Sequence, residues 1–175
     1  MMRNFYTRVL IITFLLAVII FMTGRAIGAY RHHNPWVKFE ATVTEVIDGD
    51  TVRISGSKRS VRLLGIDAPE TNHPDFPQQR YGVESKRYLE TMIKGKKVIL
   101  EYNKREPFDI YNRILAYIYT AEGTMVNAEM VKTGHAYVYE KKQCSRVKEL
   151  LVLENIARQL KKGIWKHDIG GREKR

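Results

Sequence analysis

Arg62, Asp67 and Glu70 are the residues whose types and spacing are best suited to chemistry. Together they place a guanidinium and two carboxylates within nine residues. Residues 61–66 are otherwise apolar and predict a buried strand, and Pro69 ends it because proline has no N–H to donate to a sheet. Side chains at such a strand end can converge on a ligand. A carboxylate pair beside an arginine is what a metal-assisted attack of water on a phosphodiester requires.

A second acidic group lies at the turn Asp48-Gly49-Asp50. We expect glycine to let the backbone turn, so that Asp50 opens the strand that pairs with the strand ending at Asp67. Carboxylates at the ends of neighbouring strands can share one hard cation through their oxygen atoms. Taken alone, Asp-Gly-Asp is more often only a turn.

Glu70 and two arginines would complete such a site. A carboxylate near a metal can orient and deprotonate a water molecule, which is the role expected of Glu70. Arg62 and Arg113 can neutralise the charge that develops on a phosphate under attack. The alternative for Arg62 is an arginine at a strand edge whose head reaches solvent.

Hydrophobic periodicity and turn residues predict an α+β chain. The predicted strands are residues 38–47, 51–55, 60–66, 97–102 and 114–119, and the predicted helices are residues 83–94, 125–132 and 144–161. In the last helix six residues are expected to face inward: Val147, Leu150, Leu151, Ile156, Ala157 and Leu160. Five strands with a helix after the third fit a small Greek-key barrel of the oligonucleotide-binding (OB) type. A generic α+β sheet fits the same pattern.

The net charge of +11 favours a polyanionic partner, with nucleic acid as the leading candidate. A soluble surface with many charges would explain the balance equally well. Cys144 is the only cysteine, which excludes an internal disulfide and a thiolate zinc site. We expect it to be a helix residue and not a nucleophile.

The N-terminus resembles a targeting or anchoring segment. Arg3 and Arg8 precede an uncharged block of 14 residues, 9–22, which as a helix is about 21 Å long, shorter than the roughly 30 Å hydrocarbon core. Small residues follow, as in a signal peptide, and an uncleaved anchor is the alternative. Either would export the remainder to the extracellular space or the periplasm, tethered to the membrane through residues 9–24 if the segment stays uncleaved.

Four segments are expected along the chain. Residues 1–29 would be the signal peptide or anchor, 30–37 a linker with two solvated histidines, 38–167 the folded domain, and 168–175 a disordered polar tail.

Three linked motifs resemble the staphylococcal nuclease (thermonuclease) family. They are Val46–Thr51, Arg62–Thr71 and Asp109–Tyr117, in an order and at separations that agree with the family over about residues 38–167. The resemblance implies a five-stranded OB-fold barrel with about three helices. It also implies hydrolysis of DNA and RNA to products with 3′-phosphate ends, using one calcium ion. A catalytically inactive barrel that binds single-stranded nucleic acid is the alternative. We expect a monomer.

The resemblance also assigns roles to residues. Asp50, Asp67 and the backbone carbonyl of Ala68 would bind calcium, Glu70 would be the general base, and Arg62 and Arg113 would hold the phosphate under attack. For substrate binding it assigns Tyr111 and Tyr137, although barrel packing would explain those two tyrosines equally well.

Two positions depart from the family pattern next to Arg113. Asn112 replaces a glycine, and asparagine tolerates a positive φ better than most residues. Ile110 replaces a lysine, which predicts weaker binding of a terminal phosphate.

Overall fold

The computed structural model describes residues 12–21, 34–71, 79–140 and 144–167. The chain divides into two units, Met1–Asn34 and Pro35–Arg175. In the first unit residues 12–21 are helical, which confirms the N-terminal hydrophobic helix. Within the described residues we find no helix with the length and apolar character needed to cross a membrane.

Several predictions fall outside the described residues. They concern the signal-peptide flanks, the two linker histidines and the C-terminal tail.

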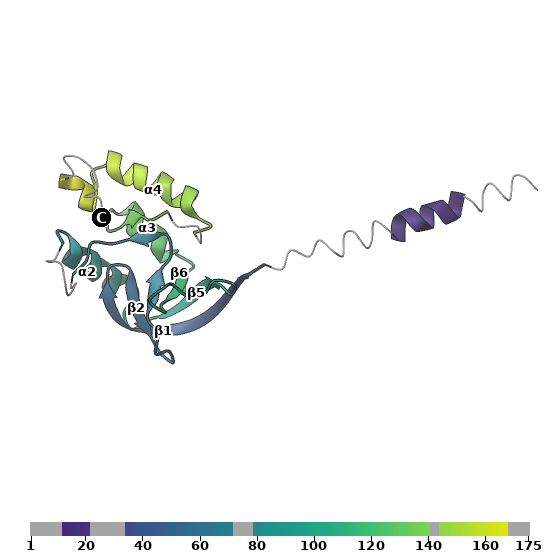
Figure 1. Cartoon of the computed structure of the whole chain (residues 1–175). Coiled ribbons are helices and arrows are strands. Elements are labelled where there is room, and N and C mark those ends of the chain that lie inside the picture. The colour runs from purple at the N-terminus through teal and green to yellow at the C-terminus, as the bar shows by residue number, and fades with distance from the viewer. Residues whose placement is uncertain (1–11, 22–33, 72–78, 141–143, 168–175) are drawn as a thin grey trace, which may run out of the picture. The chain divides into compact units, whose positions relative to one another are not determined.

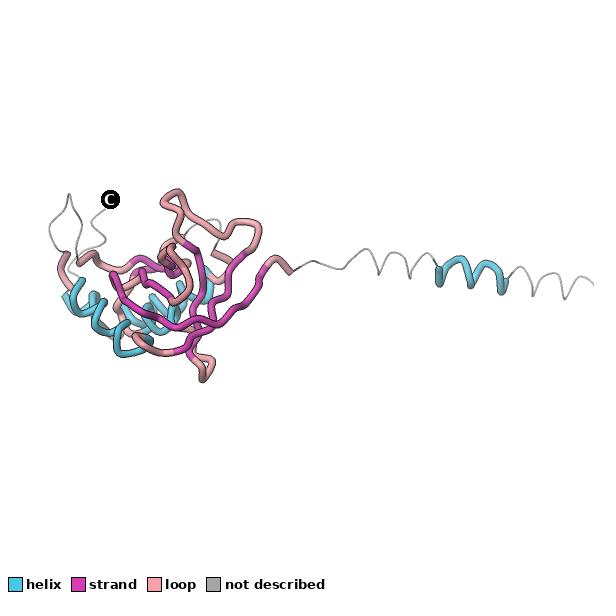
Figure 2. The backbone as a smooth tube through the Cα atoms, turned by 90° about the horizontal axis from the view of Figure 1, so that it is seen from below, coloured by secondary structure: helices cyan, strands magenta, loops and turns pink. Residues whose placement is uncertain are grey.

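Five strands of the second unit close into a barrel in the order β1-β2-β3-β6-β5 (Figure 1). Neighbouring strands are antiparallel except β3 and β6, which run parallel. Figure 2 follows the strands around the barrel. This confirms the predicted five-stranded OB-type barrel. The barrel strands are β1 (Trp36–Asp48), β2 (Thr51–Ile54), β3 (Val61–Leu63), β5 (Lys97–Asn103) and β6 (Ile114–Thr120).

Alternation along these strands fills the barrel with apolar side chains. In β2, Val52 and Ile54 are buried while Arg53 between them is exposed, as expected for a strand with one face on the core. The largest side chains that lose all contact with solvent include Tyr117, Leu63, Ile66, Leu89, Leu100 and Met130. The core therefore lies inside the barrel and extends beneath the helices.

The predicted strand 60–66 is wrong in its second half. The chain leaves the barrel at Leu64, turns at Gly65 with φ 81°, and forms a separate strand β4 (Ile66–Asp67). A Cβ at Gly65 would lie 2.4 Å from the sulfur of Cys144, so only glycine fits. Strand β4 pairs with β7 (Tyr137–Val138) and not with β2 as expected.

The described part of the second unit holds three α-helices: α2 lies between β4 and β5 along the chain, α3 and α4 come after β6, and α3 packs on α4 (Figure 1). Leu150 and Ala157 of α4 are buried as predicted, but Ile156 and Leu160 are 40% and 60% exposed. Ile156 lies about 240° around the helix from Leu150, so it cannot share the inward stripe. Cys144 is buried in the turn before α4, not in the helix. The helices are α2 (Gly82–Ile93), α3 (Val126–Lys132), α4 (Val147–Gln159) and the 3₁₀ helix η1 (Gly163–His167).

Candidate active site

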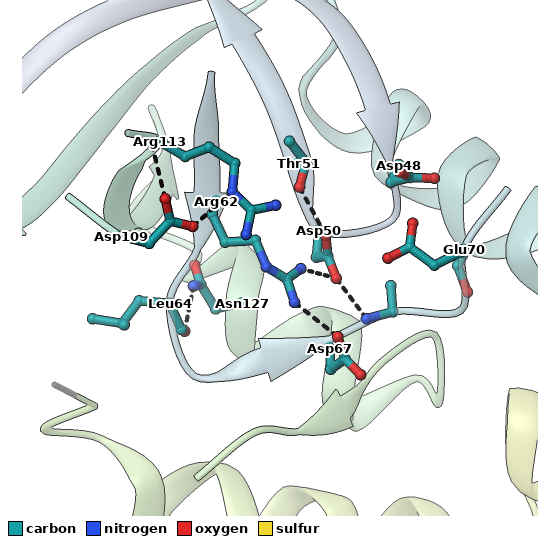
Figure 3. Close-up of polar contacts among 12 residues, drawn as sticks. Asp48, Asp50, Thr51, Arg62, Leu64, Asp67, Glu70, Asp109, Arg113 and Asn127 are labelled. Atoms are coloured by element: carbon teal, nitrogen blue, oxygen red, sulfur yellow. Dashed lines mark hydrogen bonds and ion pairs between the residues drawn. The ribbon is translucent and has the colours of Figure 1, made fainter. Parts of the chain in front are cut away.

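Arg62 lies between two carboxylates from different parts of the fold (Figure 3). It comes from β3, and its guanidinium pairs with Asp50 of the β1–β2 turn and with Asp67 of β4, the latter at 2.8 Å between Nη2 and Oδ1. The Arg62 side chain is 13% exposed and that of Asp50 only 5%. The two predicted metal ligands thus converge, and Arg62 is not a strand-edge arginine that reaches solvent.

Close packing at Gly49 holds Asp50 against the other strand end. A Cβ at Gly49 would lie 2.6 Å from that of Ala68 and 2.8 Å from that of Ser85. Its absence lets Asp50 Oδ2 accept the Ala68 N–H at 2.7 Å, while Oδ1 accepts the Thr51 hydroxyl at 2.9 Å. Gly49 is therefore needed for close approach.

The backbone of Glu70 is fixed by residues on both sides. Its N–H donates to Oε1 of Gln79 at 3.0 Å, and its carbonyl accepts the Gln79 N–H at 3.0 Å. The next residue, Thr71, donates its N–H and its hydroxyl to Oδ1 of Asp48. Gly82 packs so closely that a Cβ there would lie 2.6 Å from the Glu70 carbonyl oxygen. The Glu70 side chain points toward Asp50 (Figure 3).

Arg113 faces the same pocket from the loop before β6. Its Nε–H donates to Asp109 Oδ2 at 2.7 Å, and Asp109 Oδ1 accepts the N–H groups of Arg113 and Tyr111. Asn112 adopts φ 62°, so asparagine keeps the left-handed turn that glycine would otherwise supply. The turn and the ion pair together hold the Arg113 guanidinium beside that of Arg62 (Figure 3).

Electrostatics ties these groups into one cluster. Burial lowers the pKa of Arg62, and Arg113 lowers it further, while Asp67 and Glu70 raise it. Burial alone would raise the pKa of Asp109, but hydrogen bonds from the backbone and side chain of Arg113 hold it below its ordinary value. Together with Asp50, which pairs with Arg62, four carboxylates and two cations therefore interact in one cluster.

The two tyrosines with expected binding roles differ in exposure. Tyr111 is 74% exposed, and the Arg113 guanidinium lies 5.2 Å from its ring centroid, so it does not pack in the barrel. Tyr137 is half-buried and meets Trp165 edge-on at 5.0 Å. Tyr111 therefore lies on the exposed loop beside Arg113, whereas Tyr137 packs against Trp165.

The donor set fits a hard cation. Asp50, Asp67 and the carbonyl of Ala68 offer only oxygen atoms, which calcium prefers. The described residues contain no group of three or more His, Cys, Asp and Glu side chains that could hold a metal. Asp50 and Asp67 would be the acidic ligands of calcium, and its remaining ligands would be a backbone carbonyl and water.

Sequence reasoning missed the residues that support this pocket. Glu154 of α4 is 8% exposed and accepts the Val138 N–H at 2.8 Å, which secures the partner strand of β4. Buried Asn127 binds the Leu64 carbonyl at 2.9 Å where the chain leaves the barrel. Glu154 lies on the apolar stripe of α4, four residues from Leu150. A charged residue at that position was the sequence signal that could have indicated a buried, hydrogen-bonded carboxylate. For Gln79 the sequence offers no signal.

The fold and the pocket define an OB-fold barrel with clustered carboxylates and arginines at its edge. A sequence model described as "Staphylococcal nuclease homologue" matches residues 60–167. The chain belongs to this family.

Relatives agree with the family match. The chain is 41% identical over 125 residues to an "Uncharacterized endonuclease" of Escherichia coli, covering 70% of this chain and 74% of that protein. It is 37% identical over 138 residues to the "Thermonuclease" of Staphylococcus intermedius, covering 77% and 81%. The "Thermonuclease" of Staphylococcus hyicus is 36% identical over 129 residues, covering 70% and 73%.

Proposed function

We propose that this protein is a calcium-dependent nuclease that hydrolyses phosphodiester bonds of DNA and RNA to products with 3′-phosphate ends. The observation that carries the proposal is the single pocket in which Arg62 joins Asp50 and Asp67, with Glu70 and Arg113 beside it. Family membership and the names of the relatives support nuclease activity. Calcium use and the product ends follow the family resemblance.

Glu70 is the general base in this proposal. Its backbone is fixed by Gln79 and by the Asp48–Thr71 contact, so its carboxylate can take a proton from a water positioned for in-line attack. The water oxygen bonds to phosphorus, the bond from phosphorus to the 5′-oxygen breaks, and that oxygen takes up a proton. The phosphate stays on the 3′ side.

Arg62 and Arg113 neutralise the charge that grows on the phosphate oxygens during attack. Asp109 orients Arg113 through the 2.7 Å ion pair, and one guanidinium carries enough donors to serve a carboxylate and a phosphate together. Asp50, Asp67 and the Ala68 carbonyl would hold calcium. When bound, calcium would polarise a phosphate oxygen and neutralise part of its charge.

Digestion by the full chain tests the proposal. Single- and double-stranded DNA and RNA are incubated with calcium or with excess chelator, and product ends are analysed. We expect cleavage only with calcium. Glu70→Gln should lower the rate about 10²- to 10⁴-fold and Arg113→Ala about 10²- to 10³-fold, with unchanged unfolding curves.

Glu45→Gln is the matched control, because Glu45 is 58% exposed on β1 and pairs with Arg53. It should cleave at the normal rate. Full activity of purified Glu70→Gln would falsify the role given to Glu70. Binding without cleavage by the unmodified chain would favour the binding-only barrel.

We also propose that the protein acts outside the cytoplasm. The support is the sequence order of Arg3, Arg8 and the apolar block 9–22. Cell fractionation with N-terminal sequencing of the mature chain tests this, and a chain retained in the cytoplasm would contradict it.

A further inference from the structure

The loop between Phe108 and Ile114 exposes apolar side chains beside the pocket. Phe108 is 44% exposed, Ile110 91% and Tyr111 74%. Phe108 and Ile114 pair as an isolated antiparallel bridge, and the Asn112 N–H donates to the Asp109 carbonyl at 3.0 Å. The loop is therefore a hydrogen-bonded hairpin that holds its apolar side chains outward.

Arg59, from the turn before β3, lies against this loop. Its guanidinium carbon lies 4.7 Å from the centroid of the Phe108 ring, and its Nε–H donates to Asn112 Oδ1 at 2.9 Å. Among the described residues no carboxylate forms an ion pair with Arg59, whereas the exposed Arg53 pairs with Glu45 at 3.0 Å. A guanidinium fixed on an aromatic ring, with its charge unpaired there, suits an anionic ligand.

Strand pairing places Arg59 next to Arg113. Strands β3 and β6 are parallel, with Val61 beside Ile114, and the Ile114 N–H donates to the Ser60 carbonyl at 2.9 Å. Parallel neighbours begin at the same edge of a sheet, so the residues just before each strand lie together. Arg59 and Arg113 therefore flank one loop, with Arg113 facing the pocket.

We propose that Arg59 and Phe108 form a subsite for one unstacked nucleotide of a single-stranded nucleic acid, next to the phosphate at Arg113. The inference rests on the proposed function and extends it beyond the groups that carry out hydrolysis. The base stacks on the Phe108–Arg59 pair, and the terminal nitrogens of Arg59 bind a neighbouring phosphate. Positive charge and continuity with the pocket identify the occupant as the substrate strand.

Stacking selects a single strand over a duplex. A base must leave its own stack before it can lie on Phe108, and a paired strand resists this. The subsite should therefore add to the binding of a single strand and add little to that of a duplex.

Binding measurements test the subsite. The full chain carrying Glu70→Gln, in which cleavage should be slow, is titrated with a labelled oligothymidylate of about eight nucleotides in calcium at several salt concentrations. Adding Arg59→Ala or Phe108→Ala should weaken binding about fivefold or more. Arg59→Ala should also lower the salt slope by about 0.7. For a duplex of equal length the loss should stay within about twofold.

Two further variants serve as comparisons. Arg59→Lys separates stacking from attraction by charge, and Asn112→Gly separates contact with the ligand from the contact between Arg59 and Asn112. Arg59→Lys keeps the charge but not the planar stack, so it should keep the salt slope of the parent and recover only part of the affinity that Arg59→Ala loses. Asn112→Gly keeps the left-handed turn and removes the Arg59 partner, and it should bind nearly as well as the parent.

Lys94→Ala is the control for charge, because Lys94 is 53% exposed and pairs with Glu90. It follows the last residue of α2, about 18 Å along the helix from the end that packs on Glu70. Lys94→Ala should bind the oligonucleotide with the same affinity as the parent.

The subsite would be overturned if the parent and Arg59→Ala bound with equal affinity. It would also be overturned if Asn112→Gly lost as much affinity as Arg59→Ala. Full rescue by Arg59→Lys would overturn the stacking. The proposed function fails by a different result, the absence of cleavage by the unmodified chain.

Discussion

At the scale of single residues, Arg62 is the centre of the pocket. It brings Asp50 and Asp67 together although they lie on different segments. Around this cluster the chain uses residues with no chemistry of their own. Gly49 is one of them, because its lack of a side chain lets the β1–β2 turn approach Ala68.

Replacing Gly49 by alanine tests that close approach. A Cβ there would meet those of Ala68 and Ser85 below 3.0 Å, so Gly49→Ala should lower the free energy of unfolding by about 1–3 kcal/mol. It should also reduce the rate of hydrolysis, because Asp50 moves away from the Ala68 N–H. Chemical denaturation and a cleavage assay measure the two effects.

A double-mutant cycle shows whether the clash is the cause. Combining Gly49→Ala with Ala68→Gly removes the nearest Cβ and should restore part of the lost stability. Strictly additive losses would show that the contact with Ala68 is not responsible.

At the scale of elements, the β4–β7 pair is the part that sequence patterns did not predict. Each strand has two residues, too few for a periodic signal. Glu154 contacts β7: its carboxylate accepts the Val138 N–H and pairs with Arg158 at 3.4 Å. Helix α4 thereby fixes the strand that carries Asp67.

Substituting Glu154 should loosen this pair. Glu154→Ala leaves the Val138 N–H without its acceptor and should cost about 1–3 kcal/mol of unfolding free energy. Glu154→Gln keeps an acceptor oxygen and should cost less. Amide hydrogen exchange at Val138 measures the local effect, and unchanged protection in Glu154→Ala would refute the role of α4.

At the scale of the whole molecule, much of the architecture could be predicted from the sequence. Alternating strands and three spaced motifs predicted the barrel and the five clustered groups. The break at Gly65 and the Gln79 contact could not be predicted, because both depend on neighbours distant in sequence. Local sequence patterns do not indicate contacts between residues that are distant in sequence.

The stability of the domain should depend on pH through His135. Its ring stacks on Tyr88 at 4.0 Å and lies 5.5 Å from Tyr81. Burial lowers its pKa to about 4, and Glu84 opposes the shift. Between the unfolded pKa of about 6.5 and about 4, the unfolded chain binds a proton that the folded chain does not. Stability therefore falls as pH falls through this window and loses nothing further below it.

Chemical denaturation at about pH 7 and about pH 4.5 checks this contribution. The unmodified chain should lose more stability than His135→Leu, by the order of 1 kcal/mol after allowance for solvent screening of a partly exposed ring. Equal losses in both proteins would show that other groups govern the acid response.

Asp50 and Asp67 lie on two different parts of the fold. Asp50 belongs to the barrel, while Asp67 belongs to the two-stranded sheet that α4 braces. The distance between these two carboxylates therefore depends on how α4 and the two-stranded sheet pack on the barrel. Substitutions on α4 that never contact a nucleotide should therefore change the separation of Asp50 and Asp67, and with it the affinity of the proposed cation site.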